Sequence, residues 1–368
     1  MHYIIVNSSS TFDCRIDILC EVLIEKGHTY TVISSDFRHI EKNKRVEIKK
    51  DYHYIKTIAY KKNISLTRLL SHYRFTKDVF DFIKNKSCDV LYLVIPPNSQ
   101  GTLAKLYKSL YPNTRIVVDI IDMWPESLPI KGTSMFPITL WGKIRDNAIR
   151  NSDYIITECE LYQKKLLSHL ASKPCKNIYW SSTTTIYDEL WSVLPNDIVN
   201  LCYLGSINNI IDIKEIGHII KQISQIKPVV FHVIGDGEKR EKLLDASKNA
   251  GAHVVYHGKI YDAYEKQKVF AQSHFGLNIM KQNVCVGLTM KSIEYFSAGL
   301  PIINNIPGDT EFLVNKYSMG INISETITEN IQKEFNRYHI REVYEDLFSA
   351  HRIRQKWIET IEEIESLK

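Results

Sequence analysis

The feature that most constrains this chain is a regular alternation of short apolar runs with helical patterns. Runs typical of strands occur at residues 2–6, 30–33, 90–95, 115–120, 154–157, 201–204, 229–234, 253–256, 275–279 and 301–304. Helical patterns occur at residues 15–25, 67–84, 102–110, 212–224, 238–250, 264–271 and 291–298. Strands joined by helices form parallel sheets that are covered on both faces, which explains their continuous apolar character. The pattern predicts an α/β chain of two doubly wound, Rossmann-like domains.

The length of 368 residues fits two domains, since one domain takes roughly 150 residues. The polar stretch around Pro195 predicts the boundary, with an N-terminal domain at residues 1–195 and a second domain at residues 196–340. Residues 341–368 contain no Gly or Pro and are expected to be helical.

Several classes of protein are disfavoured by what the sequence lacks. No apolar run approaches the ~20 residues that span a bilayer, and residues 1–15 lack the basic segment of a signal peptide. We therefore expect a cytoplasmic protein. The seven Cys are scattered without C-x-x-C spacing, which favours reduced thiols over a metal or redox site.

The first strand–helix loop, Asn7–Thr11, contains no Gly, which argues against a nicotinamide dinucleotide site. The chain has no P-loop, and no Asp-x-Asp pair that would hold a metal together with a nucleotide diphosphate. We expect no metal and no cofactor.

The second half contains the candidate binding residues. Gly205 and Ser206 follow a predicted strand, at the end where open parallel sheets bind ligands. The next helix is expected to start near Asp212, and its dipole favours a phosphate. Lys214 in its first turn is equally well explained as a solvated lysine or as a diphosphate contact.

Two further turns follow strands of the same domain. Gly235 and Gly237 are adequately explained by a plain turn. The main chain of Gly258, Lys259 and Ile260 is placed to contact the edge of a nucleobase.

Residues Gly287, Leu288 and Thr289 present backbone N–H groups at the start of a predicted helix. Lys291 and Glu294 are three residues apart and share one face of that helix. A carboxylate accepts hydrogen bonds from ribose hydroxyls, and a lysine neutralises a leaving diphosphate. The alternative is a surface Lys–Glu pair worth about 0.3 kcal/mol.

These residues, followed by Gly299-Leu-Pro301, resemble the C-terminal nucleotide-sugar domain of the GT-B glycosyltransferases of family 4. The segment Asp122-Met-Trp124-Pro125-Glu126 resembles the D-x-W-P-E segment of members that build bacterial surface polysaccharides. The resemblance implies two domains that face each other across a cleft, with the C-terminal helix packing back towards the N-terminal domain.

The resemblance also implies roles for single residues. Glu294 matches the second glutamate of the E-x7-E motif, which holds the donor ribose. The expected donor-binding residues are Gly205, Ser206, Lys214, Gly235, Gly258, Lys259, Ile260, Gly287, Leu288, Thr289, Lys291 and Glu294. The first glutamate of the motif, which faces the donor sugar, is replaced by Val286.

The N-terminal domain is expected to hold the acceptor. Asp122 is the favoured acceptor-side carboxylate and Glu126 the second, with Trp124 beside them. Ser8, Ser9 and Ser10 are expected to line the floor of the cleft. Together with Lys291, the two carboxylates are the catalytic candidates. Alternatively, Asp122 caps a turn and Trp124-Pro125 only packs.

The net charge of +5 is unevenly distributed. Residues 38–77 contain twelve Lys or Arg against three acidic residues, interleaved with aromatic side chains. Ile64, Leu66, Leu69, Leu70 and Tyr73 form an apolar stripe there. Such a segment favours peripheral contact with an anionic membrane, and the alternative is a solvated loop followed by a helix that faces the core. No nucleic-acid motif is present.

These patterns lead to a functional hypothesis. We expect a glycosyltransferase, retaining and independent of metal, that uses a nucleotide diphosphate sugar, with uridine as the favoured base. Its acceptor would be a lipid-linked saccharide or another surface glycan, such as capsule or O-antigen, at the inner face of a bacterial membrane. Val286 leaves a non-catalytic GT-B subunit as an alternative, and a sugar-nucleotide epimerase on the same fold is another.

Overall fold

The computed structural model describes residues 1–46, 48–62, 65–128, 138–170, 173–181, 187, 190–191 and 193–367. The chain divides into two compact units. One comprises Met1–Tyr179 with Ile353–Lys368, and the other comprises Trp180–Arg352. The predicted boundary at residues 195/196 thus lies beyond the start of the second unit, and the predicted terminal segment, 341–368, is divided between the two units.

The first unit contains a seven-stranded parallel sheet in the order β5-β2-β1-β6-β7-β8-β9. Its strands are β1 (His2–Asn7), β2 (Thr29–Ser35), β5 (Tyr52–Ile55), β6 (Val90–Ile95), β7 (Arg115–Ile120), β8 (Tyr154–Thr157) and β9 (Cys175–Asn177). A separate antiparallel pair is formed by β3 (Phe37–Arg38) and β4 (Asn43–Lys44). The six residues of β6 are all buried, as expected for a central strand covered on both faces.

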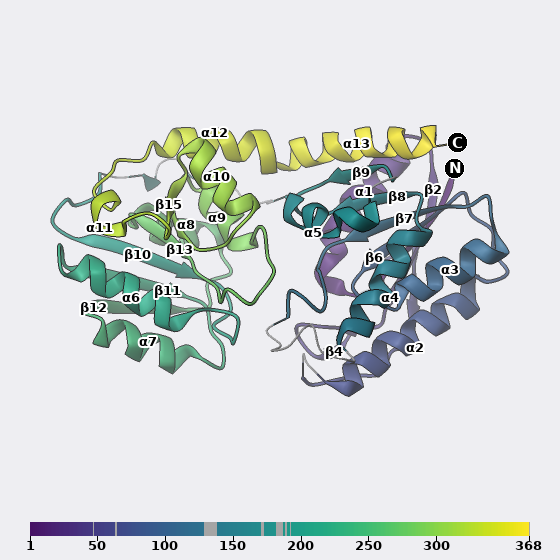
Figure 1. The fold of residues 1–368 in the computed structure, drawn as a ribbon, viewed down its shortest axis with the longest axis horizontal. Coiled ribbons are helices and arrows are strands. Elements are labelled where there is room, and N and C mark those ends of the chain that lie inside the picture. The colour runs from purple at the N-terminus through teal and green to yellow at the C-terminus, as the bar shows by residue number, and fades with distance from the viewer. Residues whose placement is uncertain are drawn as a thin grey trace. The chain divides into compact units, whose positions relative to one another are not determined.

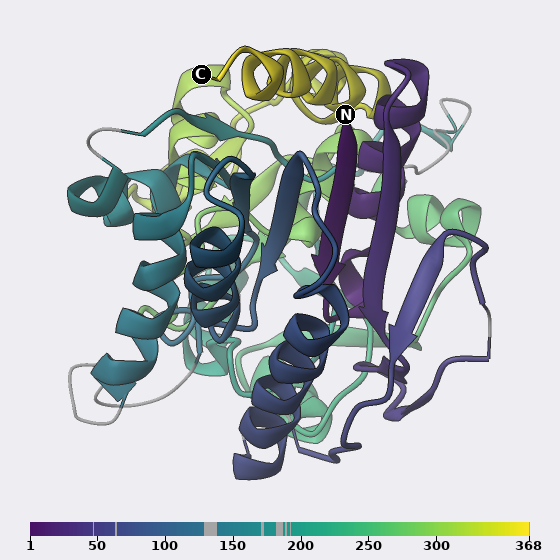
Figure 2. The same cartoon turned by 90° about the vertical axis from the view of Figure 1, so that its right-hand side faces the viewer.

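The helical segments of the first unit are η1 (Ser10–Phe12), α1 (Asp13–Glu25), α2 (Leu66–Ile83), α3 (Gln100–Leu110), α4 (Ile138–Asn151), α5 (Glu160–Leu170) and α13 (Ala350–Ser366). In α2, the C-terminal half turns Phe75, Val79 and Ile83 into the core at a spacing of four residues. Figure 2 shows this unit with β1 and β2 side by side and the yellow α13 above them.

Helix α13 packs on the first unit through Ile353, Trp357, Ile361 and Ile364, which are all buried. The guanidinium of Arg15 lies 5.1 Å from the Trp357 ring. The helix is joined to the unit by ion pairs such as Lys26–Glu362 and Lys176–Glu363, each at 2.8 Å. The single helix expected over residues 341–368 is therefore two helices, because Ser349 leaves helical geometry (φ −59°, ψ 150°).

The second unit contains a six-stranded parallel sheet in the order β12-β11-β10-β13-β14-β15. Its strands are β10 (Val199–Leu204), β11 (Val229–Ile234), β12 (Ala252–Gly258), β13 (Phe275–Asn278), β14 (Ile302–Asn304) and β15 (Gly320–Asn322). Its helices are α6 (Ile213–Ser224), α7 (Arg240–Asn249), α8 (Ala263–Ala271), α9 (Met290–Ser297), α10 (Asp309–Tyr317), α11 (Ile327–Asn330) and α12 (Arg337–Phe348).

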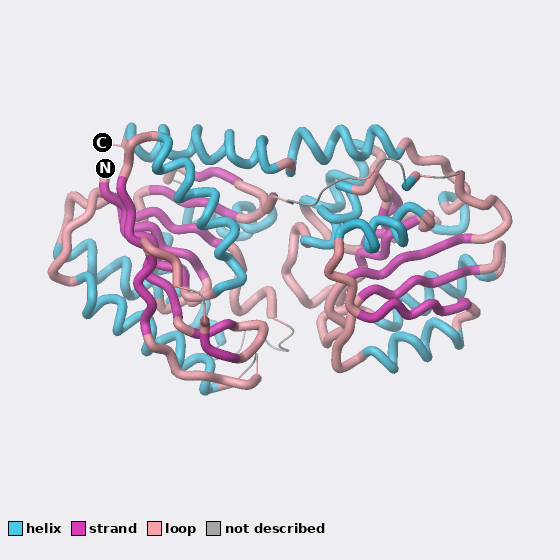
Figure 3. The backbone as a smooth tube through the Cα atoms, turned by 180° about the vertical axis from the view of Figure 1, so that it is seen from behind, coloured by secondary structure: helices cyan, strands magenta, loops and turns pink. Residues whose placement is uncertain are grey.

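Within the second unit, α6 and α7 lie on one face of the sheet and α9 and α10 on the other (Figure 1). The buried stripe of α6 consists of Ile213, Ile216, Ile219, Ile220 and Ile223, a helical spacing that matches the flat apolar surface of a sheet. Figure 3 shows the strands of each sheet running side by side with helices outside them. The prediction of two doubly wound, Rossmann-like domains is confirmed.

The strand order reverses between β10 and β13 in the second sheet. Open parallel sheets bind ligands beyond the carboxyl ends of the strands at such a switch point. Among the described residues, no helix is both long enough and apolar enough to cross a membrane.

Candidate functional site

Three glycines lie at the carboxyl ends of the neighbouring strands β10, β11 and β12, and their backbones are joined by hydrogen bonds. Gly205 N–H donates to the Ile234 carbonyl at 3.0 Å, and Gly235 N–H donates to the Gly258 carbonyl at 2.7 Å. Gly235 has a φ of +135°, and a Cβ on it would lie 2.0 Å from the Gly205 carbonyl oxygen. The turn at Gly235 therefore requires glycine, and it brings three strand ends close without intervening side chains.

The loop before α9 is also held firmly. The Thr289 hydroxyl accepts from Ser292 N–H at 3.2 Å and donates to the Asn278 amide oxygen at 2.9 Å. The Gly287 carbonyl accepts from Thr310 N–H at 2.8 Å. The Thr289 side chain is thus occupied by capping, and Leu288 is buried. What this loop offers to an anion is the backbone N–H groups at the start of α9.

Lys291 is the most unusual side chain of the second unit. Its Nζ atom is buried and has no hydrogen-bond partner among the described residues. It lies 4.5 Å from the centroid of the Tyr203 ring, and burial lowers the pKa of Lys291 to about 8. A buried ammonium without an acceptor is unfavourable unless a ligand supplies one. This atom is a ready contact for an anionic group.

The surface-pair alternative assumed an ion pair between Lys291 and Glu294, but Glu294 pairs with another lysine. Its carboxylate accepts from Lys266 Nζ of α8 at 2.6 Å. Lys266 was not predicted as a site residue. It lies 28 residues before Glu294 and on another helix, so no spacing in the sequence indicated the contact. The pair holds Glu294 in place through one of its two carboxylate oxygens, Oε2.

The turn after β12 rests on a histidine pair that the sequence did not indicate. His232 Nδ1 and His257 Nε2 lie 3.0 Å apart, and the rings stack at 5.3 Å. Burial, with His257 nearby, lowers the pKa of His232 to about 4, so the pair shares a hydrogen bond in the neutral form. Lys259 is exposed and Ile260 partly exposed just beyond this pair.

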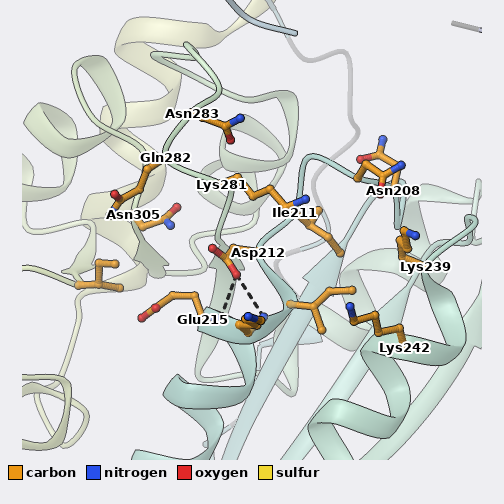
Figure 4. Close-up of a pocket in the computed structure, with 14 residues that line it drawn as sticks. Asn208, Ile211, Asp212, Glu215, Lys239, Lys242, Lys281, Gln282, Asn283 and Asn305 are labelled. Atoms are coloured by element: carbon orange, nitrogen blue, oxygen red, sulfur yellow. Dashed lines mark hydrogen bonds between the residues drawn. The ribbon is translucent and has the colours of Figure 1, made fainter. Parts of the chain in front are cut away.

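Lys214 lies apart from the other predicted donor residues. It lines a cavity of about 550 Å³ that also contains Lys239, Lys242 and Lys281 (Figure 4). None of the other predicted donor residues is among the described residues that line this cavity. Asp212 caps α6 by accepting from the N–H groups of Lys214 and Glu215, while Lys214 and Ser206 are exposed.

In the first unit, the three predicted serines are held in the turn after β1. Ser9 caps η1, and its hydroxyl lies 2.7 Å from the Thr11 hydroxyl. Ser8 Oγ donates to the Pro96 carbonyl at 3.4 Å. Ser10 lines a small cavity of about 220 Å³ with Arg38 and Arg45.

Asp122 and Glu126 are both engaged by neighbours. One Asp122 oxygen accepts from Trp124 Nε1 at 2.7 Å and the other accepts from the Ser127 hydroxyl. Burial raises the pKa of Asp122. Glu126 is bound by both terminal nitrogens of Arg145 in α4, at 2.6 and 3.2 Å. Both carboxylates thus fix the D-x-W-P-E segment, which agrees with the turn-capping alternative for Asp122.

Trp124 lies in an aromatic and cationic stack. The Arg68 guanidinium is 4.2 Å from its ring centroid, and the His72 ring stacks on it at 5.6 Å. Trp124 lines a cavity that does not contain Ser10 among its described lining residues. None of the three predicted serines is among the described residues that line this cavity with Trp124. The described residues contain no cluster of three or more His, Cys, Asp or Glu suited to a metal ion.

Comparisons with known proteins agree with this geometry. Residues 199–332 match the family described as Glycosyl transferases group 1. The matched range covers the six strands of the second sheet and the loop before α9. A search of curated proteins found no match.

Solved structures show the same fold over the whole chain. Sucrose-phosphate synthase from Thermosynechococcus elongatus is 12% identical, with full coverage of both chains and a TM-score of 0.70. The lipopolysaccharide outer core galactosyltransferase WaaB is 12% identical over 99% of each chain, also with a TM-score of 0.70. HepE from Anabaena, solved in complex with UDP, is 13% identical over 99% of this chain and 100% of that one, with a TM-score of 0.66.

The fold is therefore that of the GT-B glycosyltransferases. The match of residues 199–332 to the group 1 glycosyl transferases, together with this fold, supports a glycosyltransferase.

Proposed function

We propose that the enzyme transfers a sugar from a nucleotide diphosphate sugar, with uridine as the base, to a saccharide acceptor in bacterial surface glycan synthesis. The observation that carries the donor class is Lys291, whose buried Nζ lacks an acceptor one turn before Glu294. The similarity to HepE, whose structure contains UDP, supports uridine. The similarity to WaaB supports a surface glycan as product.

In this proposal each donor group meets a defined part of the second unit. The diphosphate lies at the N-terminus of α9, where the backbone N–H groups of residues 287–289 and the Lys291 ammonium bind it. Glu294, held by Lys266, accepts hydrogen bonds from the ribose hydroxyls. The main chain of residues 258–260 contacts the base. Lys214 is set apart from these contacts, because the described residues that line its cavity include none of the other proposed donor residues.

We propose a retaining reaction that requires no metal. The acceptor hydroxyl attacks the anomeric carbon, the bond from that carbon to the diphosphate oxygen breaks, and the nucleoside diphosphate leaves. A phosphate oxygen of the donor takes the acceptor proton, so no side-chain base is needed. Lys291 stabilises the charge that develops on the leaving diphosphate, while residues of the first unit position the acceptor.

Replacing Glu294 tests the donor site. Glu294→Ala is expected to weaken UDP binding by at least tenfold, because hydrogen bonds to a charged group contribute about 1.5–3 kcal/mol. The readout is the UDP-dependent rise in melting temperature, since a ligand that binds the native state stabilises it. Glu265→Ala is the matched control, because Glu265 forms a similar pair with Lys268 on the exposed side of α8. We call this rise in melting temperature the UDP shift. A UDP shift in Glu294→Ala equal to that of the wild type would exclude the ribose role of Glu294.

Replacing Asp122 tests the acceptor side. Asp122→Asn is expected to lower sugar transfer more than tenfold and to leave the UDP shift unchanged, because Asp122 lies in the first unit. Ser127→Ala removes one hydrogen bond to Asp122 and is expected to lower transfer less than threefold. If both variants lose the same amount of sugar transfer, Asp122 only holds its turn in place and does not contact the acceptor. Full transfer by Asp122→Asn would remove it from the acceptor site.

A second candidate function is a non-catalytic subunit that binds a sugar nucleotide. It is favoured by Val286 and by the absence of any Asp or Glu from residue 281 to residue 293. UDP binding without hydrolysis or transfer of any sugar nucleotide would support it. An epimerised sugar nucleotide formed without acceptor would instead support the epimerase alternative.

We further propose that residues 38–77 contact an anionic membrane from the cytoplasmic side. Leu66, Leu70 and Tyr73 are 84, 56 and 62% exposed, so the apolar stripe does not face the core. Lys61 and Lys62 are exposed beside it, although Arg45 and Lys49 are paired with Asp13 and Asp17. Glu47, Asn63 and Ile64 lie outside the described residues. Co-sedimentation with phosphatidylglycerol vesicles tests this contact.

A further inference from the structure

An apolar cavity of about 560 Å³ opens between α2 and α4 in the first unit. Leu66, Leu69 and Tyr73 of α2 line it on one side, and Leu140, Trp141 and Ile144 of α4 line it on the other. Volumes of this order hold a drug-sized ligand. The leucines and Tyr73 in the first half of α2 are exposed to solvent, whereas Phe75 and Val79 in its second half are buried.

One cation lies in this apolar lining. Arg68 stacks on Trp124, which is 4% exposed, and its guanidinium also contacts Tyr60 and is within electrostatic reach of Asp122. His72 also lines the cavity, and burial with Arg68 nearby lowers its pKa to about 3, so it is neutral. Among the described lining residues, Arg68 is the only one that is charged at neutral pH.

A ligand that complements such a cavity has a hydrocarbon chain and one anionic group. A free sugar would place hydroxyls against leucine and tryptophan side chains that offer few hydrogen-bond partners. A hydrocarbon without charge would not use the positive charge of Arg68, whereas a phosphate forms charge-assisted hydrogen bonds with arginine. The chemistry points to an alkyl or isoprenyl phosphate.

We propose that the cavity between α2 and α4 binds the hydrocarbon chain of a phosphorylated single-chain lipid, with the phosphate at Arg68. This inference rests on the proposed function, because we take the bound lipid to be the carrier of the saccharide acceptor. The D-x-W-P-E segment is then a wall of the acceptor site: Trp124 supports Arg68, and Asp122 follows β7 next to it.

Monomeric alkyl phosphates test the proposal directly. Octyl and decyl phosphate, used below their micelle concentrations, are titrated into the full chain by calorimetry. Decyl phosphate is expected to bind about tenfold more tightly than octyl phosphate, because each buried methylene group adds up to roughly fourfold. Inorganic phosphate is expected to show no measurable binding in the same range.

Two variants locate the binding. Leu140→Asp introduces a charge into the cavity at a residue that is 47% exposed, and it is expected to weaken decyl phosphate binding at least tenfold. Leu110→Asp is the matched control, because Leu110 is 50% exposed on α3 and is not a described lining residue. Arg68→Met is expected to weaken decyl phosphate binding while leaving decanol binding unchanged.

The outcomes separate this inference from the proposed function. A chain that shows a UDP shift but binds no decyl phosphate overturns the lipid cavity and leaves the donor site intact. A chain that binds decyl phosphate without any UDP shift keeps the cavity and overturns the donor site. Binding that occurs only on anionic vesicles, or that Leu140→Asp does not weaken, also overturns the proposal.

Discussion

Replacing Lys291 by methionine is expected to stabilise the ligand-free enzyme and to abolish UDP binding. The pKa of Lys291 is lowered from 10.5 to about 8, and each unit corresponds to about 1.36 kcal/mol. The charged form therefore costs on the order of 3 kcal/mol at pH 7, and the lost contact with Tyr203 offsets about 1 kcal/mol of the gain. A net gain of about 2 kcal/mol raises the melting temperature by roughly 4–8 °C.

The pH dependence provides a second signature of the same residue. Because the folded protein releases the Lys291 proton at a lower pH than the unfolded chain, wild-type stability should rise as pH increases from about 8 to 10.5. A bound diphosphate favours the ammonium, so UDP affinity should fall above pH 8. Lys291→Met should lack both dependences.

Lys268→Met is the matched control for this experiment. Lys268 lies on α8, is 42% exposed and pairs with Glu265. Its replacement should change neither the melting temperature by more than about 1 °C nor the UDP shift, because exposed pairs contribute only about 0.2–1 kcal/mol. If Lys291→Met instead melts at a lower temperature or keeps its UDP shift, the lysine is structural and the diphosphate lies elsewhere.

Gly235→Ala is expected to destabilise the second unit by about 3 kcal/mol or more. Its φ of +135° is strained for a residue with a Cβ, and that atom would lie 2.0 Å from the Gly205 carbonyl oxygen. Strain of this kind costs about 1–3 kcal/mol, and overpacking adds a similar amount. The measurement is the free energy of unfolding from urea denaturation followed by circular dichroism.

Gly258→Ala separates the free-energy cost of the positive φ from the cost of overpacking by the added Cβ. Gly258 has a φ of +70°, but nothing lies within 4 Å of a Cβ placed there. Only the left-handed conformation is then penalised, by about 1–2 kcal/mol. Equal losses in the two variants would mean that the Gly235 turn relaxes and that the close approach of the strand ends is not required.

The core strands could be predicted from the sequence because each is a continuous apolar run. The bounds of β6, β7, β8 and β11 coincide with the predicted ones. The edge strands β9 and β15 have three residues each, too few to show a pattern. The point near Ile353 at which the chain returns to the first unit could not be located by composition. The break between α12 and α13 is at Ser349, and no Gly or Pro marks it.

The relative placement of two candidate site residues could be predicted where spacing along one helix determines the geometry. Lys291 and Glu294 share α9 as their three-residue spacing requires. The contacts of these two side chains could not be predicted from the sequence, because their partners Tyr203 and Lys266 belong to other elements. The same limit applies to Arg68, which reaches Trp124 only through the fold. It does not apply to Asp122, whose two bonded partners, Trp124 and Ser127, are close to it in the sequence.

The placement of α13 has a consequence for synthesis on the ribosome. Trp357, the side chain beside Arg15, is translated only after the whole of Trp180–Arg352. At about 5–20 residues per second this takes roughly 10–35 s. During that time Arg15, which lies 2.7 Å from Asp119 in the finished core, lacks the indole that packs against its guanidinium. The half of the enzyme that is made first is therefore the half that is completed last.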